Sequence, residues 1–139
     1  MKRIILSLLV IAAGFSSCSK DDDKEGNTEK STTDLIIGTW QVVAINDLSD
    51  DDCEILSTLE IKADGTYLEQ SYGGFTGSCS PDELDKGTWE VSGKMFTQKQ
   101  DGRVFENTIT KLTENSLILK FEHSNEDGTT LTEVWTYEK

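Results

Sequence analysis

The chain of 139 residues has few of the residues from which catalytic and metal sites are usually built. It contains one histidine, His123, and three cysteines, and no serine lies in a Gly-x-Ser-x-Gly segment. A serine nucleophile needs a base and an orienting group, and a zinc ion needs several nitrogen or sulfur ligands. The sequence therefore predicts no enzyme, no metal centre and no cofactor, and His123 is expected to be an ordinary surface residue.

Basic residues are also scarce. The 13 lysines and arginines face 26 aspartates and glutamates, so that the formal net charge is −13. Nucleic-acid binding depends on lysine and arginine to neutralise phosphates, and this balance excludes a nucleic-acid partner. The charge is better explained by solubility and by repulsion between like-charged surfaces.

Carboxylates are so numerous that a pair with a spacing suitable for glycoside hydrolysis arises by chance in many places. One cluster stands out, because Asp50, Asp51 and Asp52 are followed by Glu54. It could bind calcium in a loop, although it lacks the spacing of an EF-hand. The alternative is a solvated acidic loop.

The one long apolar run is too short for a transmembrane helix. It extends from Ile4 to Phe15 after Lys2 and Arg3, whereas a spanning helix needs about 20 apolar residues. This pattern is typical of a secretory signal peptide over residues 1–17. The following Ser16-Ser17-Cys18 resembles the lipobox of bacterial lipoproteins, which implies lipid attachment, palmitate included, at Cys18. The alternative is a simple secretory signal in which Cys18 is incidental.

Residues 18–34 contain no apolar side chain that could join a core, and they are predicted to form a flexible linker after the lipidated cysteine. The acidic run at residues 19–25 resembles the export signal of surface lipoproteins in certain anaerobic Gram-negative bacteria. That resemblance implies an outer-membrane protein that is anchored by lipid and faces outward. The alternative is that the acidic run is only a solvated spacer.

Residues 35–139 are predicted to form one all-β domain. Turn pairs such as Asp64-Gly65, Asp101-Gly102 and Asp127-Gly128 separate short segments in which apolar residues alternate with polar ones, as in strands. No segment predicts a long helix, and the only proline, Pro81, is expected in the longest loop. The eight expected strands lie near residues 37–46, 55–63, 66–73, 87–92, 94–100, 103–112, 116–123 and 129–138.

Eight strands joined in sequence by tight turns favour an up-and-down antiparallel barrel, because closure removes the exposed sheet edges. Such a barrel has an interior just wide enough to be filled by side chains or to hold one small ligand. Gly38-Thr39-Trp40-Gln41-Val42 recurs as Gly87-Thr88-Trp89-Glu90-Val91, each time at the start of a strand. This repeat indicates a fold in which Trp40 and Trp89 belong to the core.

Leu35-Ile36-Ile37-Gly38-Thr39-Trp40 resembles the first-strand Gly-x-Trp motif of lipocalins. Together with Lys62-Ala63-Asp64-Gly65-Thr66-Tyr67 and Gly87-Thr88-Trp89, it is similar to the small lipocalin-like domains of bacterial surface lipoproteins. The resemblance implies an eight-stranded barrel and capture of a small apolar molecule. The chain is shorter than a typical lipocalin and shows no carboxy-terminal helix.

Cys53 and Cys79 are expected to form a disulfide, because an exported protein meets no reducing pool. Their placement also agrees with the cysteine positions of similar lipocalin-like domains. The alternative of a metal-binding or nucleophilic pair finds no partner residues in the sequence.

Two functions compete. In the first, the barrel binds a small apolar ligand, and the expected wall residues are Trp40, Val42, Leu59, Ile61, Trp89, Val91, Leu119, Phe121 and Trp135, although core packing explains them equally well. In the second, a filled barrel serves as a structural or accessory surface protein. It would contact a protein or glycan through Tyr72 and Phe75, which lie beside Gly73 and Gly74.

Overall fold

The structure, a computed structural model, describes residues 30–46, 53–75 and 77–139. The predicted signal peptide, Cys18, the first part of the linker and the Asp50–Asp52 cluster lie outside the described residues. Glu54, the remaining member of that cluster, lies in a short 3-10 helix, η1.

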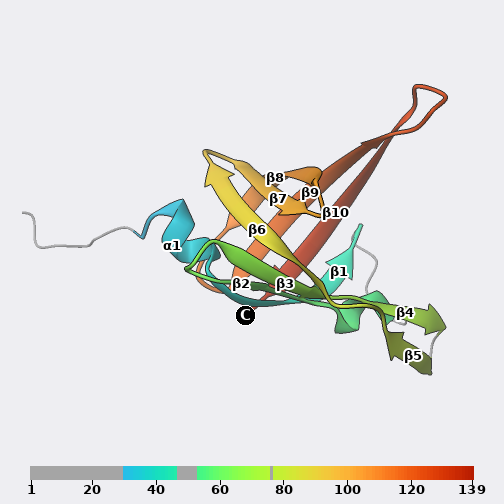
Figure 1. The fold of residues 1–139 in the computed structure, drawn as a ribbon. Coiled ribbons are helices and arrows are strands. Elements are labelled where there is room, and N and C mark those ends of the chain that lie inside the picture. Colours follow the sequence, from blue (N-terminus) through green and yellow to red (C-terminus); the bar gives the residue numbers. More distant parts are fainter. Residues whose placement is uncertain (1–29, 47–52, 76) are drawn as a thin grey trace, which may run out of the picture.

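The described chain forms a closed barrel of eight antiparallel strands, as predicted (Figure 1). Neighbouring strands around the barrel follow the order β1-β10-β9-β8-β7-β6-β3-β2, so that the first and last strands close it. The barrel strands are β1 (Gly38–Ile45), β2 (Thr58–Ile61), β3 (Thr66–Gln70), β6 (Asp85–Ser92), β7 (Met95–Gln100), β8 (Arg103–Leu112), β9 (Ser116–Ser124) and β10 (Thr130–Glu138).

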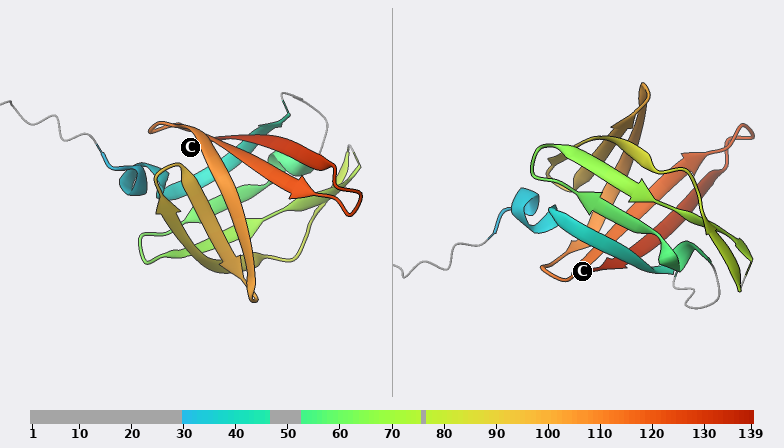
Figure 2. Two further views of the ribbon diagram at one scale, coloured as in Figure 1. Left: turned by 90° about the horizontal axis from the view of Figure 1, so that it is seen from above. Right: turned by 60° about the horizontal axis from the view of Figure 1, so that its bottom comes forward.

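A second, two-stranded sheet was not predicted. It consists of β4 (Tyr72–Phe75) and β5 (Ser78–Pro81), and this hairpin projects beyond the barrel (Figure 2). The prediction that Pro81 lies in a loop is wrong, because Pro81 is the last residue of β5 and pairs with Tyr72. Proline cannot donate a backbone hydrogen bond, and it is tolerated at this position because both strands of a two-stranded sheet are edge strands.

The strand expected from residue 55 begins only at Thr58, because η1 occupies Cys53–Leu56. Cys53 in η1 forms the predicted disulfide with Cys79 in β5, with 5.3 Å between the two Cα atoms. The bond joins the projecting hairpin to the segment between β1 and β2. Neither thiol is therefore free to act as a nucleophile or a metal ligand.

A short helix, α1 (Thr32–Ile36), closes one end of the barrel. It begins with a capping box, in which the Asp34 backbone N–H donates to the Ser31 hydroxyl at 3.1 Å and the Ser31 N–H donates to the Asp34 carboxylate at 3.3 Å. Ordered structure thus begins before residue 35, within the segment predicted as linker. No helix in the described part of the chain is long and apolar enough to cross a membrane.

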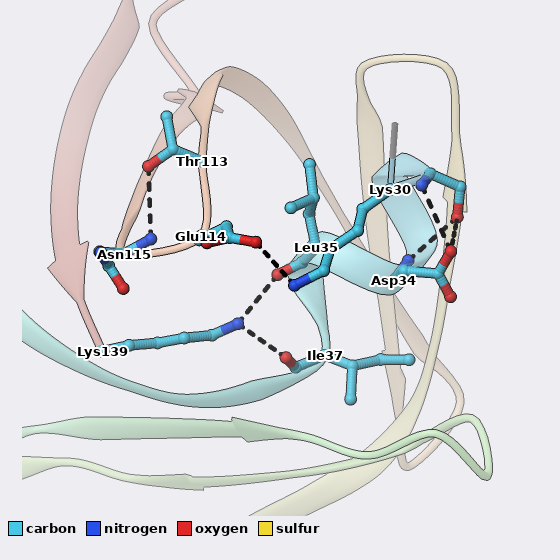
Figure 3. A network of polar contacts seen from close by, with 9 residues as sticks. Lys30, Asp34, Leu35, Ile37, Thr113, Glu114, Asn115 and Lys139 are labelled. Atoms are coloured by element: carbon cyan, nitrogen blue, oxygen red, sulfur yellow. Dashed lines mark hydrogen bonds and ion pairs between the residues drawn. The ribbon is translucent and has the colours of Figure 1, made fainter. Parts of the chain in front are cut away.

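Side chains from both ends of the domain hold α1 in place (Figure 3). The Lys139 ammonium donates to the Leu35 and Ile37 carbonyls at 3.0 and 2.8 Å and lies 4.3 Å from the centre of the Trp40 ring. The Lys30 ammonium pairs with Glu114 at 2.7 Å. These contacts fix α1 against the closed end of the barrel.

The core fills the half of the barrel next to α1. One buried member, Ile36, comes from α1. The others share the inward face of their strands and are Trp40, Val42, Leu59, Ile61, Tyr67, Phe96, Ile109, Leu117, Leu119 and Tyr137. The two repeated tryptophans lie where the repeat predicts. The Trp40 indole N–H donates to the Ile36 carbonyl at 2.7 Å, and that of Trp89, which packs against the core, donates to the Lys62 carbonyl at 2.9 Å.

Candidate functional site

The barrel interior is open at the end away from α1 and holds a cavity of about 250 Å³. Six strands contribute to its wall. The lining residues are Tyr67, Glu69, Asp85, Gln98, Gln100, Phe105, Phe121, His123, Glu133 and Trp135.

The cavity forms because the inward side chains change from apolar to polar along several of its strands. In β3, the buried Tyr67 is followed two residues later by Glu69, and in β7 the buried Phe96 is followed by Gln98 and Gln100. Alternate residues of a strand face the same side, so these polar residues continue the core rows into the open end. The same step joins Phe121 to His123 in β9 and Trp135 to Glu133 in β10.

Three aromatic rings form the apolar part of the wall: Phe105 from β8, Phe121 from β9 and Trp135 from β10. The rings of Phe121 and Trp135 are tilted against each other with centroids 5.6 Å apart, and Trp135 stacks on the buried Tyr137 at 6.3 Å. Such pairs add stability beyond their buried area. The aromatic wall is therefore anchored to the core below it.

Polar side chains on the other parts of the wall are connected by hydrogen bonds. Gln98 donates to Glu69 at 3.3 Å and Gln100 donates to Asp85 at 2.5 Å. The Tyr67 hydroxyl donates to the Gln100 carbonyl oxygen at 3.4 Å. Each amide is thus oriented by two different partners, because Gln98 also accepts from the buried Asn107 at 3.1 Å.

The cavity is an acidic environment. Burial raises the pKa of Glu69, and the nearby Asp85 raises it further, whereas the hydrogen bond from Gln98 opposes the shift. Burial, followed by the charges of Glu69, Asp85 and Asp101, raises the pKa of Tyr67 to about 12. Burial, with a contribution from Glu69, also raises the pKa of Tyr137 well above its ordinary value. In all three groups, burial is the largest cause of the raised pKa, and a neighbouring carboxylate adds to it.

Of the nine predicted wall residues, the structure places two in the cavity, Phe121 and Trp135. Trp89 and Val91 are partly buried and pack against the core without lining the cavity. The remaining five, Trp40, Val42, Leu59, Ile61 and Leu119, belong to the filled half of the barrel. Ligand contact by any of these side chains stays a prediction.

Sequence reasoning missed eight lining residues, most of them polar. The signal for them was present, since Glu69, Gln98 and Glu133 stand at positions whose spacing from Tyr67, Phe96 and Trp135 directs them inward. Polar residues on an otherwise apolar strand face mark the place where a barrel stops being filled. The single histidine, His123, is exposed as expected, and it also lies at the rim of this cavity.

Other candidate sites are weaker. A larger hollow of about 490 Å³ lies on the outer face of β7, β8 and β9. It is lined by outward side chains that include Met95, Glu106 and Lys120, and its surface is mostly polar. In residues 30–46, 53–75 and 77–139, no three His, Cys, Asp or Glu side chains are grouped to hold a metal ion. Phe75, one of the two predicted contact residues, is 87% exposed, and Tyr72 is half-buried.

Fold and site together define a single-domain antiparallel barrel, capped by a helix at one end and with an aromatic and acidic cavity at the other. The model of the lipocalin-like domain family matches residues 36–119, and the chain belongs to this family. The match includes every buried core residue except Tyr137, and it ends before Phe121, His123, Glu133 and Trp135. These four cavity residues therefore lie beyond the matched region.

Solved structures of bovine odorant-binding protein resemble the chain at low sequence identity. The complex with undecanal has a TM-score of 0.49 and 16% identity over 83% of this chain and 77% of its own. The deswapped triple mutant has a TM-score of 0.47 and 15% identity over 73% and 72%. No curated protein sequence matches the chain.

Proposed function

We propose that this protein binds a small, mainly apolar molecule in the open end of its barrel and acts by binding rather than by catalysis. The observation that carries the proposal is the 250 Å³ cavity walled by Phe105, Phe121 and Trp135, in a barrel whose other half is filled. Ligand sites are concave, largely apolar and equipped with a few convergent polar groups. Pockets for drug-sized molecules measure about 300–1,000 Å³, so the ligand here is smaller.

The three tryptophans offer a test with internal controls. Only Trp135 lines the cavity, whereas the indole N–H groups of Trp40 and Trp89 are bonded to backbone carbonyls near the closed end. In a ¹⁵N-labelled sample, a neutral aromatic probe such as 2-phenylethanol is expected to shift the Trp135 indole signal and to leave the other two unchanged. The Trp135→Phe variant assigns the signal. Equal shifts of all three signals, or no shift at millimolar probe, would contradict the proposal.

Lipid anchoring at Cys18 is the second part of the proposed function. It is supported by the basic, apolar and small-residue segments that precede Cys18. Lys30 lies beside the capped end through its contact with Glu114, and 30 − 18 = 12 residues separate it from Cys18. A fully extended chain spans at most about 3.5 Å per residue, so this segment allows up to about 40 Å between the lipid and the barrel. The proposed anchor is thus attached at the end of the barrel opposite the cavity mouth.

A Cys18→Ala variant tests the anchor. The variant is expected to fold with an unchanged circular dichroism spectrum and to leave the membrane fraction, while the native protein incorporates an alkyne-labelled palmitate. Persistent membrane association of the variant would refute the anchoring role of Cys18.

Outward display on the outer membrane is proposed from the acidic run at residues 19–25. External protease added to intact cells should degrade the native protein. It should spare a variant in which Asp21, Asp22 and Asp23 are replaced by asparagine if that run directs export. Protection of the native protein would instead favour a location facing the periplasm.

A structural or accessory protein that contacts a protein or glycan partner is the second candidate. The exposure of Phe75 on a disulfide-linked hairpin favours it. It also requires a filled barrel, and the cavity argues against that. A photo-crosslinking residue at position 75 should yield one discrete adduct on intact cells if this hairpin binds a partner, and no adduct would remove the candidate.

A further inference from the structure

Among the described residues, three carboxylates line the cavity, and no lysine or arginine does. Glu69 comes from β3, Asp85 from β6 and Glu133 from β10, so they approach from different parts of the wall. None of them belongs to the four ion pairs formed among the described residues. The described wall has two other ionisable groups, the Tyr67 hydroxyl and His123 at the rim. The site thus presents negative charge without a protein cation to balance it.

Each carboxylate is fixed by one donor of the wall. Oε2 of Glu69 accepts from the Gln98 amide, Oδ1 of Asp85 accepts from the Gln100 amide, and Oε2 of Glu133 accepts from the Trp135 indole N–H at 3.1 Å. In the described part of the chain, no side-chain or backbone donor bonds to the second oxygen of any of the three. These wall donors are therefore directed at protein carboxylates, whereas three carboxylate oxygens are left to accept from a ligand.

We propose that the ligand of this cavity is a small organic cation, whose ammonium group is attracted by the carboxylates of Glu69, Asp85 and Glu133 and whose apolar body packs against Phe105, Phe121 and Trp135. This inference rests on the proposed function and narrows its ligand class. An ammonium group has three donors and no acceptor, which matches a site with spare acceptors. The faces of Trp135 and Phe121 also attract a cation.

The same arrangement disfavours the other ligand classes. A carboxylate or phosphate would enter a cavity that already holds three acidic groups, and the indole N–H and one N–H of each wall amide already donate to those groups. A neutral alcohol could give one hydrogen bond to the carboxylates but could not offset their charge. The electrostatics agree, because burial and Asp85 raise the pKa of Glu69, and a bound cation would supply the stabilisation that ionised Glu69 lacks.

Three probes of similar shape and different charge test the inference on the purified protein by calorimetry at pH 7: 2-phenylethylammonium, 2-phenylethanol and 3-phenylpropanoate. The ammonium probe is expected to bind at least tenfold more tightly than the alcohol, which is the scale of a hydrogen bond between charged groups. The propanoate is expected to bind most weakly. Equal affinity for alcohol and amine would overturn the cation inference and leave the proposed function intact. Absence of binding by all three would count against both.

Isosteric variants test whether the cavity carboxylates cause the preference for the ammonium probe. Glu69→Gln and Glu133→Gln should each weaken the ammonium probe about tenfold and leave the alcohol unchanged. The matched control is Glu106→Gln, which removes the same charge from the outer face of β8. Since the net charge of −13 attracts any cation weakly, an equal loss in Glu106→Gln would show non-specific attraction and overturn the inference. For Glu69→Gln and Glu106→Gln, the Trp135 indole signal reports whether the variant keeps the native cavity. Glu133→Gln changes the acceptor of that indole, so the Trp40 and Trp89 indole signals report whether this variant keeps the native fold.

Discussion

Removal of the disulfide should destabilise the domain by an amount that follows from the chain length it closes. Cys53 and Cys79 are 26 residues apart in sequence. In the chain-entropy model, cross-linking such a loop stabilises the folded state by about 3.5 kcal/mol at 25 °C. For the 139 − 29 = 110 residues from Lys30 to the end of the chain, that loss lowers the melting temperature by about 15 °C. We therefore expect Cys53→Ala/Cys79→Ala to fold and to unfold at a much lower urea concentration.

Urea titrations of the native protein and of the double variant measure this difference directly. The slope of the unfolding free energy against urea should also rise, because the unlinked unfolded chain exposes more surface. Native protein unfolded in a reducing buffer is the control and should match the variant. A loss of less than about 1 kcal/mol in both samples would refute the reasoning that the bond acts on the unfolded chain.

Three further predictions concern single residues. The pKa of Glu69 is raised in the folded state, so above the ordinary value of 4.5 the folded protein binds more protons than the unfolded protein. The free energy of unfolding should therefore fall as pH rises through the folded pKa. Urea titrations at pH 4 and pH 7 should show this fall in the native protein and not in Glu69→Gln. Lys139→Met should cost about 1 kcal/mol by releasing α1, whereas the exposed control Lys94→Met should cost less than half of that. Gly87→Ala should cost about 1–3 kcal/mol in thermal unfolding, because its Cβ would overlap the Lys99 carbonyl oxygen; an unchanged stability would contradict that contact.

The barrel strands were predictable where turn residues and alternation agree. The last two strands, expected at 116–123 and 129–138, occupy Ser116–Ser124 and Thr130–Glu138, with Asp127-Gly128 in the turn between them. The β4–β5 hairpin was not predictable in this way. Its residues bury almost nothing and include two adjacent glycines, so neither alternation nor a core-facing row indicates a strand. The hairpin depends instead on backbone pairing and on the link to Cys53, which are tertiary features.

The cavity was harder to predict than the fold because apolar periodicity identifies inward rows without showing where a row ends. Trp40 and Phe121 are both aromatic residues in alternating segments of the sequence. Yet Trp40 is fully buried near the capped end, whereas Phe121 lines the open end. The difference depends on which end of the barrel each residue lies nearest, and this is a tertiary feature. At the capped end, Ile36 of α1 packs in the same core as Trp40, and the Ile36 carbonyl accepts from the Trp40 indole N–H. A search for polar residues on inward rows would have identified Glu69, Gln98 and Glu133.

An acidic interior costs a barrel stability unless something else uses it. A protein that needed only a solid scaffold could place apolar side chains at the positions of Glu69 and Glu133. The chain already has aromatic side chains two residues away on the same strand faces, at Tyr67 and Trp135. Stability and binding then respond in opposite directions to one substitution, as is common at functional sites. If Glu69 serves a ligand, Glu69→Gln must make the free protein more stable at pH 7 and the ammonium probe weaker. If Glu69 serves only the fold through its bond with Gln98, the same substitution leaves binding unchanged, so the pair of measurements separates the two roles.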